Sequence, residues 1–371
     1  MAAPENHFEV AVIGGGPAGS AAAIVLARAQ RSVLMVEKNS RGSFKIGESL
    51  PPAVLPLLDE LGVRERFVAD GHLISYGTES VWGSDELQST DFIRDPNGHG
   101  WHVDRARFDS MLREAARDCG AHVLEETRAT DARRVRAGGW RLRCDAVDRS
   151  REVFAEWVID CTGRPSWLAR REGVKRESYD RLIAFVAVFA RTDAVGSEPD
   201  RDSLTFIESV KDGWWYTSLL PAERRVVVFF TDADALAART AQRDQGFSTL
   251  LNETIHIRKR LEDLRYAMEG SPMVTSANTA RLERVDGDRW LAAGDACAAF
   301  DPLSSQGILT ALYSGLKAAI ALDSYLKGDS EALSRYADNI DAVFDAYLKN
   351  HSLFYSYEQR WPESSFWKSR R

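Results

Sequence analysis

The residues best placed for chemistry begin at a glycine-rich turn near the N-terminus. A β-rich run at 7–13 enters the segment GGGPAG, and a small-residue stretch of helical composition follows to residue 29. A second β-rich run, at 32–36, ends on Glu37. This order of strand, glycine turn, helix, strand and acid is typical of a unit that binds a dinucleotide.

The residue types of this unit each suit one task. Gly14 allows a tight turn, Gly16 lets the backbone approach a pyrophosphate, and Gly19 lets the helix pack closely on the strand. The N-terminus of the helix offers unpaired N–H groups to phosphates, and Glu37 offers oxygens to ribose hydroxyls. We expect these residues to contact the dinucleotide: Gly14, Gly16, Pro17, Ala18, Gly19, Glu37 and Lys38.

A second signature lies far along the chain and decides between NAD and FAD. A predicted buried strand at 289–293 runs into Gly294-Asp295, and a proline- and serine-rich loop leads to an Ala/Leu-rich helix at about 309–325. Asp295 can accept a ribityl hydroxyl, and the dipole of the helix would stabilise negative charge on a reduced flavin. An NAD dehydrogenase does not need this segment, so FAD is the expected cofactor. Its expected contacts here are Asp295, Pro302, Ser305, Gln306, Gly307 and Ile308.

An aromatic run in the second half of the chain predicts a β-hairpin. The segment 212–221 reads DGWWYTSLLP, a polar turn follows at 222–225, and a second strand covers 226–230. Because successive side chains of a strand point to opposite faces, one face can line a substrate pocket while the other packs into the sheet. The candidate pocket residues are Trp214, Trp215 and Tyr216, with a purely structural role as the alternative.

Composition limits the partners of the chain. Its 371 residues carry 48 Lys and Arg against 55 Asp and Glu, a formal net charge of −7, which argues against a nucleic-acid partner. The four cysteines have no metal-type spacing, so we expect no metal site and a reducing compartment. The N-terminus lacks a signal-peptide pattern, and no apolar run approaches the ~20 residues of a membrane span. We therefore expect a cytoplasmic protein without a membrane partner.

Together the motifs resemble the superfamily of flavin-dependent halogenase-like proteins and FAD-dependent monooxygenases, which have the glutathione-reductase type of FAD fold. The motifs GGGPAG, GESLPP, WHVDRARFD, DCTGR, GWWYTSLLP, GDACAAFDPLSSQGI and RWPESSFW carry the resemblance over most of the chain. The sequence is most similar to the LodB-like branch, flavoproteins that hydroxylate tryptophan when quinone cofactors form in amine oxidases.

The resemblance implies an α/β fold. A Rossmann-like FAD-binding domain, with a parallel sheet and helices in three layers, is interleaved with a substrate domain built on a mostly antiparallel sheet. We expect FAD-binding segments at 1–75, 101–170 and 276–330, substrate-domain segments at 76–100 and 171–275, and a C-terminal helical and aromatic segment at 331–371.

The resemblance also implies roles for residues of three loops. It places Glu48 and Ser49 in a strap near FAD, with a helix N-cap at Ser49 as an equal alternative. It puts an arginine ahead of a predicted helix at 110–119 beside the FAD pyrophosphate, for which we choose Arg107; a solvated charge is the alternative. Gly163 should contact FAD. Thr162 stands where aromatic hydroxylases carry Asp, so a role of this turn in binding NADPH does not carry over.

Two departures from the halogenases point to a different reaction. Halogenases carry a relay lysine after the Gly-Glu turn, but the corresponding stretch at 71–76 has none, and WWYTSL at 214–219 replaces their Trp-x-Trp-x-Ile-Pro signature. We therefore expect a monooxygenase that transfers oxygen from a flavin C4a-hydroperoxide, formed with O₂, to an electron-rich indole, phenol or peptide-bound tryptophan. His72 and Glu48 are the candidate general bases. Electrons would come from NAD(P)H or from a separate flavin reductase.

Two further interpretations remain open at this point. A reductase of the geranylgeranyl-reductase type shares the signature at 294–307 and acts on a C=C bond. A non-catalytic flavoprotein would bind a precursor protein and use FAD only as a structural element.

Overall fold

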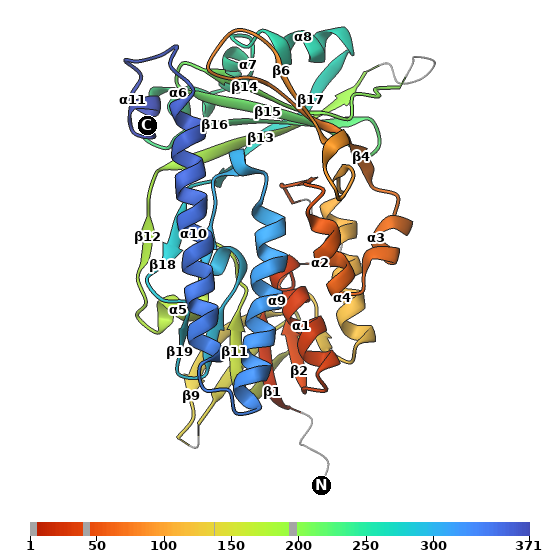
Figure 1. The fold of residues 1–371 in the computed structure, drawn as a ribbon, viewed down its shortest axis with the longest axis vertical. Coiled ribbons are helices and arrows are strands. Elements are labelled where there is room, and N and C mark those ends of the chain that lie inside the picture. Colours follow the sequence, from red (N-terminus) through yellow and green to blue (C-terminus); the bar gives the residue numbers. More distant parts are fainter. Residues whose placement is uncertain (1–5, 40–44, 137, 193–198) are drawn as a thin grey trace.

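The computed structural model describes residues 6–39, 45–136, 138–192 and 199–371. Figure 1 shows an elongated molecule with two halves, each built on a large sheet. The eight-stranded sheet lies in the half that contains the N-terminus, and the seven-stranded sheet lies across the other end. No helix within the described ranges is long and apolar enough to cross a bilayer.

The eight-stranded sheet is parallel at its centre, in the order β20-β11-β1-β2-β8. β1 and β2 read as almost continuous apolar runs because both faces are covered. An antiparallel ribbon of β9 and β10 pairs with β11, and β19 adds an edge. The strands are β1 (His7–Ile13), β2 (Val33–Val36), β8 (His122–Leu124), β9 (Arg128–Arg134), β10 (Trp140–Asp145), β11 (Ser150–Asp160), β19 (Asp286–Gly287) and β20 (Trp290–Ala292).

Small residues bring the helices of this half into close contact. α1 (Pro17–Arg28) packs between α4 (Arg105–Asp118) and α9 (Gly307–Leu326) (Figure 1). A Cβ on Gly315 would lie 2.0 Å from the Ala18 carbonyl oxygen, and one on Gly19 would lie 1.8 Å from that of Gly14. Glycine at these two positions therefore permits the contact of α1 with α9 and with the turn after β1.

The seven-stranded sheet is mostly antiparallel, in the order β17-β13-β16-β15-β14-β5-β6, with one parallel pair, β14 and β5. One face packs under α6 (Leu236–Ala241), α7 (Gly246–Leu251) and α8 (His256–Asp263). The opposite face turns toward the eight-stranded half (Figure 1). The strands are β5 (Gly77–Val81), β6 (Gln88–Asp91), β13 (Leu182–Arg191), β14 (Thr205–Val210), β15 (Gly213–Leu220), β16 (Arg224–Asp232) and β17 (Tyr266–Ser276).

Smaller elements join the two halves. One three-stranded sheet has the order β3-β7-β4 and another the order β12-β18-β21. The long helix α10 reaches from the eight-stranded half to the other sheet (Figure 1), where Tyr355, Phe366 and Trp367 are buried. The bounds are β3 (Ser49–Leu50), α2 (Val54–Glu60), α3 (Arg64–Ala69), β4 (Leu73–Ser75), β7 (Gly100–His102), α5 (Trp167–Arg171), β12 (Arg176–Ser178), β18 (Ala280–Leu282), β21 (Ala298–Ala299), α10 (Ala332–Ser356) and α11 (Ser365–Lys368).

The expected fold class, a parallel Rossmann-like sheet interleaved with a mostly antiparallel one, is confirmed. The predicted hairpin forms as β15 and β16, with Ala222 and Glu223 at positive φ in its turn. The start of the helix predicted at 110–119 is wrong. Asp104 accepts hydrogen bonds from the N–H groups of Ala106 and Arg107, so the helix begins five residues earlier, at Arg105.

Candidate active site

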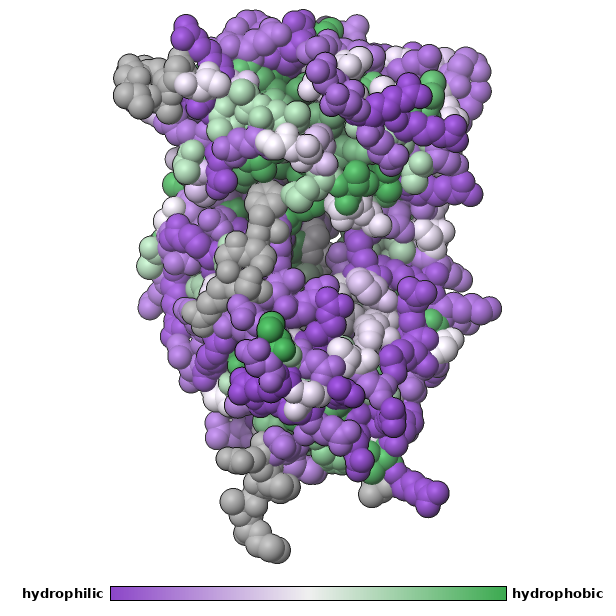
Figure 2. Space-filling view, turned by 180° about the vertical axis from the view of Figure 1, so that it is seen from behind, coloured by the Kyte–Doolittle hydropathy of each residue, from purple (hydrophilic) through white to green (hydrophobic). Residues whose placement is uncertain are grey.

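A cavity of about 870 Å³ lies between the two halves, and segments far apart in the sequence, from Ile13 to Ala311, line it. Figure 2 shows the molecule hollowed near its middle, with hydrophobic side chains gathered over the seven-stranded sheet above the hollow. One end of the cavity is formed by the turn after β1, the other by the inner face of the seven-stranded sheet.

The turn after β1 has the geometry of a phosphate cradle. Gly14 has φ +109°, and a Cβ there would lie 2.2 Å from the Cys161 carbonyl oxygen, so only glycine fits between β1 and β11. Gly16 precedes α1 in an extended conformation, and an added Cβ would meet nothing within 4 Å. No side chain caps α1, and its first-turn residues Pro17 and Ala18 line the cavity, so the N–H groups and positive dipole end of this turn are available to an anion.

Glu37 lies at the end of β2, where the carboxyl ends of the parallel strands meet. Its carboxylate accepts hydrogen bonds from the N–H of Gly15 at 2.6 Å and of Asn39 at 2.8 Å. These bonds fix the carboxylate against the cavity, and Lys38 lies beside it in the lining. A carboxylate held in this way can accept ribose hydroxyls through its remaining lone pairs.

The opposite wall is a turn after β11 that Asp160 holds in place. Its buried carboxylate accepts hydrogen bonds from the Thr162 N–H at 3.0 Å, the Thr162 hydroxyl at 2.7 Å and the Leu168 N–H at 2.7 Å. Burial raises the pKa of Asp160, and these donors oppose the shift. Gly163, at φ +76°, follows in the lining with open space where a Cβ would lie.

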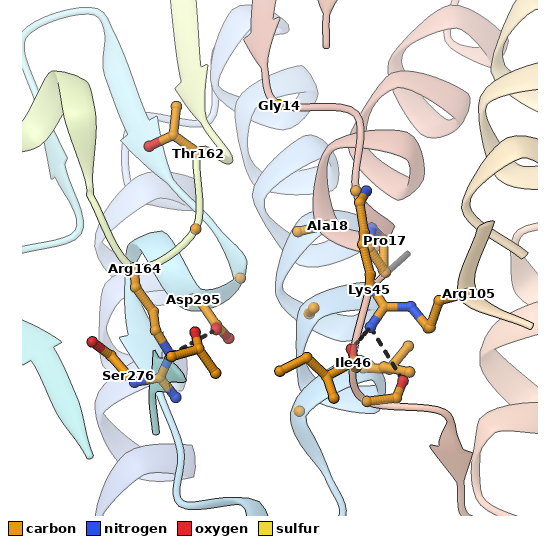
Figure 3. A pocket seen from close by; sticks show the side chains of 18 of the residues that line it. Gly14, Pro17, Ala18, Lys45, Ile46, Arg105, Thr162, Arg164, Ser276 and Asp295 are labelled. Atoms are coloured by element: carbon orange, nitrogen blue, oxygen red, sulfur yellow. Dashed lines mark hydrogen bonds and ion pairs between the residues drawn. The ribbon is translucent and has the colours of Figure 1, made fainter. Parts of the chain in front are cut away.

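Arg164 connects three segments at this wall. Its Nη1 donates to the Asn278 carbonyl at 2.5 Å and its Nη2 to the Phe300 carbonyl at 3.3 Å, while its Nε lies 3.5 Å from the Asp295 carboxylate. Figure 3 shows this ion pair on the opposite side of the cavity from Pro17 and Ala18. Arg164 therefore fixes Asp295 at the cavity surface, although it was not among the contacts expected from the sequence.

The loop before α9 supplies a further part of the cavity lining. Pro302, Ser305, Gly307 and Ile308 line the cavity, whereas Gln306, the residue preceding α9, does not. The first turn of α9 has no acidic residue and no side-chain cap, so its positive end is available to a negatively charged ring edge.

The positions of the glycines test whether FAD fits this site. Gly16, Gly163 and Gly307 come from three separate segments, and at each an added Cβ would point into empty space within the lining. A Cβ-free surface of this extent lets a large planar and phosphate-bearing ligand approach the backbone directly. The residues present therefore fit FAD.

Arg105, and not Arg107, reaches the cavity. Arg105 Nη1 donates to the Ile46 carbonyl at 2.6 Å, and its Nε lies 3.2 Å from Asp109, which also pairs with Lys45 at 2.7 Å. Figure 3 shows Arg105, Lys45 and Ile46 on one side of the cavity. Arg107, two residues further along α4, points away, and its half-exposed guanidinium donates to the Asp70 carbonyl. Both arginines of this segment were candidates in the sequence, where we chose Arg107, whereas Lys45 was not among the expected contacts.

The aromatic strand β15 divides its side chains between two environments. Trp214 and Tyr216 line the cavity, together with apolar side chains of β13, β14 and β16. Trp215 does not: it faces the other side of the sheet, where it stacks on Phe229 at 4.6 Å and meets Phe247 edge-on at 5.1 Å. The alternation of strand side chains accounts for this split.

The two candidate bases also occupy different environments, and neither lines the cavity directly. His72 is buried between Phe67 and Phe108, and its Nδ1 accepts the Asp104 N–H at 3.3 Å. Burial lowers the pKa of His72. Glu48 is 2% exposed, and its Oε1 accepts the Ser218 hydroxyl at 2.6 Å, whereas its neighbour Ser49 lines the cavity.

Comparison with known proteins identifies the class. The FAD binding domain family matches residues 7–351, so the chain belongs to this family. The putative FAD-dependent oxidoreductase LodB of Marinomonas mediterranea is 28% identical over 368 residues, 98% of this chain and 97% of LodB. The crystal structure of CmlS, a flavin-dependent halogenase, has a TM-score of 0.85 at 27% identity and covers 99% of this chain and 68% of its own.

A third protein shares the fold. The peptidyl tryptophan dihydroxylase QhpG, essential for tryptophylquinone cofactor biogenesis, has a TM-score of 0.75 at 24% identity, with 98% of this chain and 78% of QhpG covered. The expected resemblance is thus confirmed: the relatives are LodB and flavin-dependent halogenases, and the protein is an FAD-dependent oxidoreductase.

Proposed function

We propose that this oxidoreductase hydroxylates an electron-rich aromatic ring, an indole or a phenol, including one carried by a peptide. FAD, when bound and reduced, supplies the electrons that activate O₂. The protein binds the ring, excludes water and removes the proton that the ring loses. The electrons for FAD come from NAD(P)H or from a separate flavin reductase.

One observation carries the proposal: a single cavity joins the flavin cradle to an aromatic wall. Pro302 and Gly307 lie in the same lining as Trp214, Tyr216 and Phe230. Trp214 is itself stacked on Phe230 at 3.9 Å, which holds the wall rigid. Flat aromatic surfaces favour a flat aromatic ligand by stacking or edge-on contact. A ring bound there lies within the same cavity as the flavin.

The relatives support the reaction class without fixing the substrate. QhpG, which shares the fold, is a peptidyl tryptophan dihydroxylase, so a fold of this kind accommodates an aromatic ring on a peptide. LodB is described only as an oxidoreductase, and its match extends over nearly all of both chains. Indole and peptide-borne indole are therefore the first substrates to test.

Halogenation is the main competing reaction, because CmlS is a flavin-dependent halogenase. Ser75 of β4 lies in the stretch that corresponds to the one with the relay lysine of halogenases. It is buried, and its hydroxyl lies 3.5 Å from the Gly77 carbonyl oxygen. The described lysines of the cavity lining are Lys38 and Lys45, and neither belongs to the seven-stranded sheet that carries the aromatic wall. Because neither described lysine of the lining stands on the sheet that carries the aromatic wall, the site favours oxygen transfer over halide transfer.

A labelled single-turnover experiment tests the proposal. The FAD-loaded protein is reduced, mixed with ¹⁸O₂ and chloride, and given indole, phenol or a tryptophan-containing peptide. The expected product is a hydroxylated ring with one ¹⁸O atom. A chlorinated ring would replace the proposal by halogenation, and loss of a C=C bond without ¹⁸O would replace it by a reductase. Recovery of all substrates unchanged would favour a non-catalytic flavoprotein.

A further inference from the structure

A row of three hydroxyl and carboxyl groups runs from the cavity into the protein. Tyr216 lines the cavity, and its hydroxyl lies 3.2 Å from the Ser218 hydroxyl. Ser218 in turn donates to Glu48 Oε1 at 2.6 Å. Tyr216 and Ser218 are two residues apart on β15, so they share one face of the strand. Glu48 precedes β3, in a different part of the chain.

Burial separates the inner end of this row from water. Ser218 is fully buried and Glu48 is 2% exposed, so a proton can reach Glu48 most directly through the hydroxyl of Ser218. The Val103 N–H donates to the Glu48 carbonyl at 2.8 Å, which fixes the backbone that carries the carboxyl. A buried carboxyl joined to the cavity through two hydroxyls is more than packing requires, because an apolar side chain would fill the same space without a desolvation cost.

The number of protons on each hydroxyl fixes the direction of the hydrogen bonds. A hydroxyl has one proton to donate. When Glu48 is ionised, Ser218 donates to it, and Tyr216 must donate to Ser218, so the lone pairs of the Tyr216 oxygen are free toward the cavity. When Glu48 is protonated, both hydrogen bonds can reverse, and Tyr216 then offers a proton to the cavity. The orientation of the outer hydroxyl thus depends on the inner carboxyl.

We propose that Tyr216, Ser218 and Glu48 form a proton relay that takes up the proton lost by the aromatic substrate. Tyr216 is the catalytic residue of the three, because it alone lines the cavity. Ser218 and Glu48 act through it and are positioning residues. The inference rests on the proposed function, to which it adds the identity of the base.

The transfer balances without a change of oxidation state. The N–H, O–H or C–H bond of the substrate breaks, and its proton forms an O–H bond with Tyr216. The former proton of Tyr216 moves to Ser218 Oγ, and the former proton of Ser218 moves to Glu48 Oε1. One carboxylate becomes a carboxylic acid, and the electron pair of the broken bond stays on the substrate.

The surroundings of Glu48 allow its carboxyl to change protonation state. Burial raises its pKa, while hydrogen bonds from Ser218 and nearby N–H groups and the positive charge of Arg105 lower it. Arg105 is itself paired with Asp109, which reduces its influence on Glu48. His102 of the adjacent strand β7 stays neutral, because burial and the charge of Arg225 lower its pKa to about 3. A carboxyl whose pKa burial raises is a stronger base than an exposed one, so Glu48 is suited to taking up a proton.

Infrared spectroscopy of the FAD-loaded protein tests the relay without any turnover. The carbonyl band of protonated Glu48 is identified in pH-difference spectra by its loss in Glu48→Gln. We expect this band to move in Ser218→Ala and also in Tyr216→Phe, because the hydroxyls are coupled. Thr217→Val is the matched control: Thr217 is buried on the opposite face of the same strand, and its hydroxyl makes no hydrogen bond within the described structure. Its spectrum should equal that of the wild type.

Single-turnover hydroxylation of phenol provides the second test. Glu48→Gln, Ser218→Ala and Tyr216→Phe should each slow the reaction about 100-fold and remove the rise of the rate with pH that follows ionisation of Glu48. Phenol binding should change little in Glu48→Gln and Ser218→Ala. The double variant Tyr216→Phe/Glu48→Gln should be no slower than either single variant, because the residues act as a unit. Thr217→Val should retain the wild-type rate and pH profile.

The two tests separate the relay from the reaction. If the wild type gives no ¹⁸O-labelled product from any ring, the proposed function fails and the infrared spectra alone decide on the relay. An absent Glu48 band between pH 5 and 9, or a band unmoved by Tyr216→Phe, overturns the relay whatever the reaction is. So do additive rate losses in the double variant, or an unchanged pH profile in Glu48→Gln.

Discussion

The two ends of the cavity are built in different ways. At the nucleotide end, the glycines Gly16, Gly163 and Gly307 and two helix N-termini leave backbone open to the cavity. At the sheet end, the lining is side chains that alternate along strands, among them Trp214 and Tyr216. The nucleotide end offers N–H groups and open space to FAD, a ligand that is the same in every enzyme that binds it. The second presents shape and a few hydroxyls, which can change from protein to protein without disturbing the fold.

The comparison explains why the cofactor is easier to assign than the substrate. A backbone cradle needs particular residue types at particular spacings, because only glycine tolerates a positive φ or a close approach. A side-chain pocket has no such requirement, since many combinations of apolar and aromatic residues give a similar wall. Substitutions at the first end should therefore act on FAD binding alone, and substitutions at the second on the substrate alone.

The largest effect is expected from filling the backbone cradle. Gly16→Val should weaken FAD binding at least 100-fold, about 2.7 kcal/mol, because the side chain would occupy the space that lets the pyrophosphate approach. The backbone at Gly16 is extended, with φ −78°, and an added Cβ meets no protein atom within 4 Å, so the fold should tolerate valine. Titration of the FAD-free protein with FAD, followed by flavin fluorescence, measures the loss.

Gly16→Ala is the graded control for this prediction and should have a smaller effect, since it adds only a methyl group. The thermal midpoints of both FAD-free variants should match that of the wild type. If Gly16→Val binds FAD normally, the turn after β1 does not approach the cofactor, and the assignment of this end of the cavity is wrong.

The second prediction contrasts the two arginines of α4. Arg105→Gln should weaken FAD binding at least about tenfold, because Arg105 lines the cavity and a charge-assisted hydrogen bond contributes roughly 1.5–3 kcal/mol. Arg107→Gln is the matched control two residues away, and it should leave the affinity unchanged, since Arg107 contacts Asp70 outside the lining. Equal losses in both variants would mean that general positive charge, not position, attracts the cofactor.

These two arginines also show where prediction from sequence reached its limit. The strand, glycine turn and acid at 7–37 were predictable because backbone geometry restricts the residue types there. The choice between Arg105 and Arg107 required the start of α4, which Asp104 fixes by a capping bond that spacing alone does not reveal. Arg164 and Lys45 were missed for a related reason: their partners, Asn278 and Asp109, lie far away along the chain.

The third prediction contrasts the two faces of β13. Ala184 lies on the cavity face, while Ala187 packs on the other face among Phe185, Phe189 and Phe229. Ala187→Leu should lower the free energy of unfolding by about 1–3 kcal/mol, because the added methyl groups have no space. Ala184→Leu should cost less than about 1 kcal/mol but raise the KM for the aromatic substrate.

Thermal unfolding and steady-state kinetics of the two alanine variants give both quantities, and FAD affinity should be unchanged in each. Equal destabilisation by the two substitutions would show that the sheet end of the cavity is closed by packing and has no room for a ring. The division of the cavity into a cofactor end and a substrate end would then fail at the sheet.

The smallest effect concerns the junction between the two ends, where His102 of β7 meets the sheet. Its Nε2 lies 3.0 Å from the Thr205 hydroxyl on β14, and burial together with the charge of Arg225 lowers its pKa to about 3. In the unfolded chain the imidazole titrates near pH 6.5. The stabilisation from neutral His102 is therefore complete above pH 6.5 and declines as the pH falls toward 3, because the unfolded state binds a proton that the folded state does not. Well below pH 6.5, the free energy of unfolding falls by nearly 1.4 kcal/mol per pH unit, about the value for one proton.

His102→Gln keeps an amide near Thr205 but cannot titrate. The loss of unfolding free energy between pH 7.5 and 5.5 should therefore be smaller than in the wild type by about 1 kcal/mol, measured by denaturant unfolding. An equal loss in the variant would assign the acid sensitivity to other groups and leave the junction without a part in it.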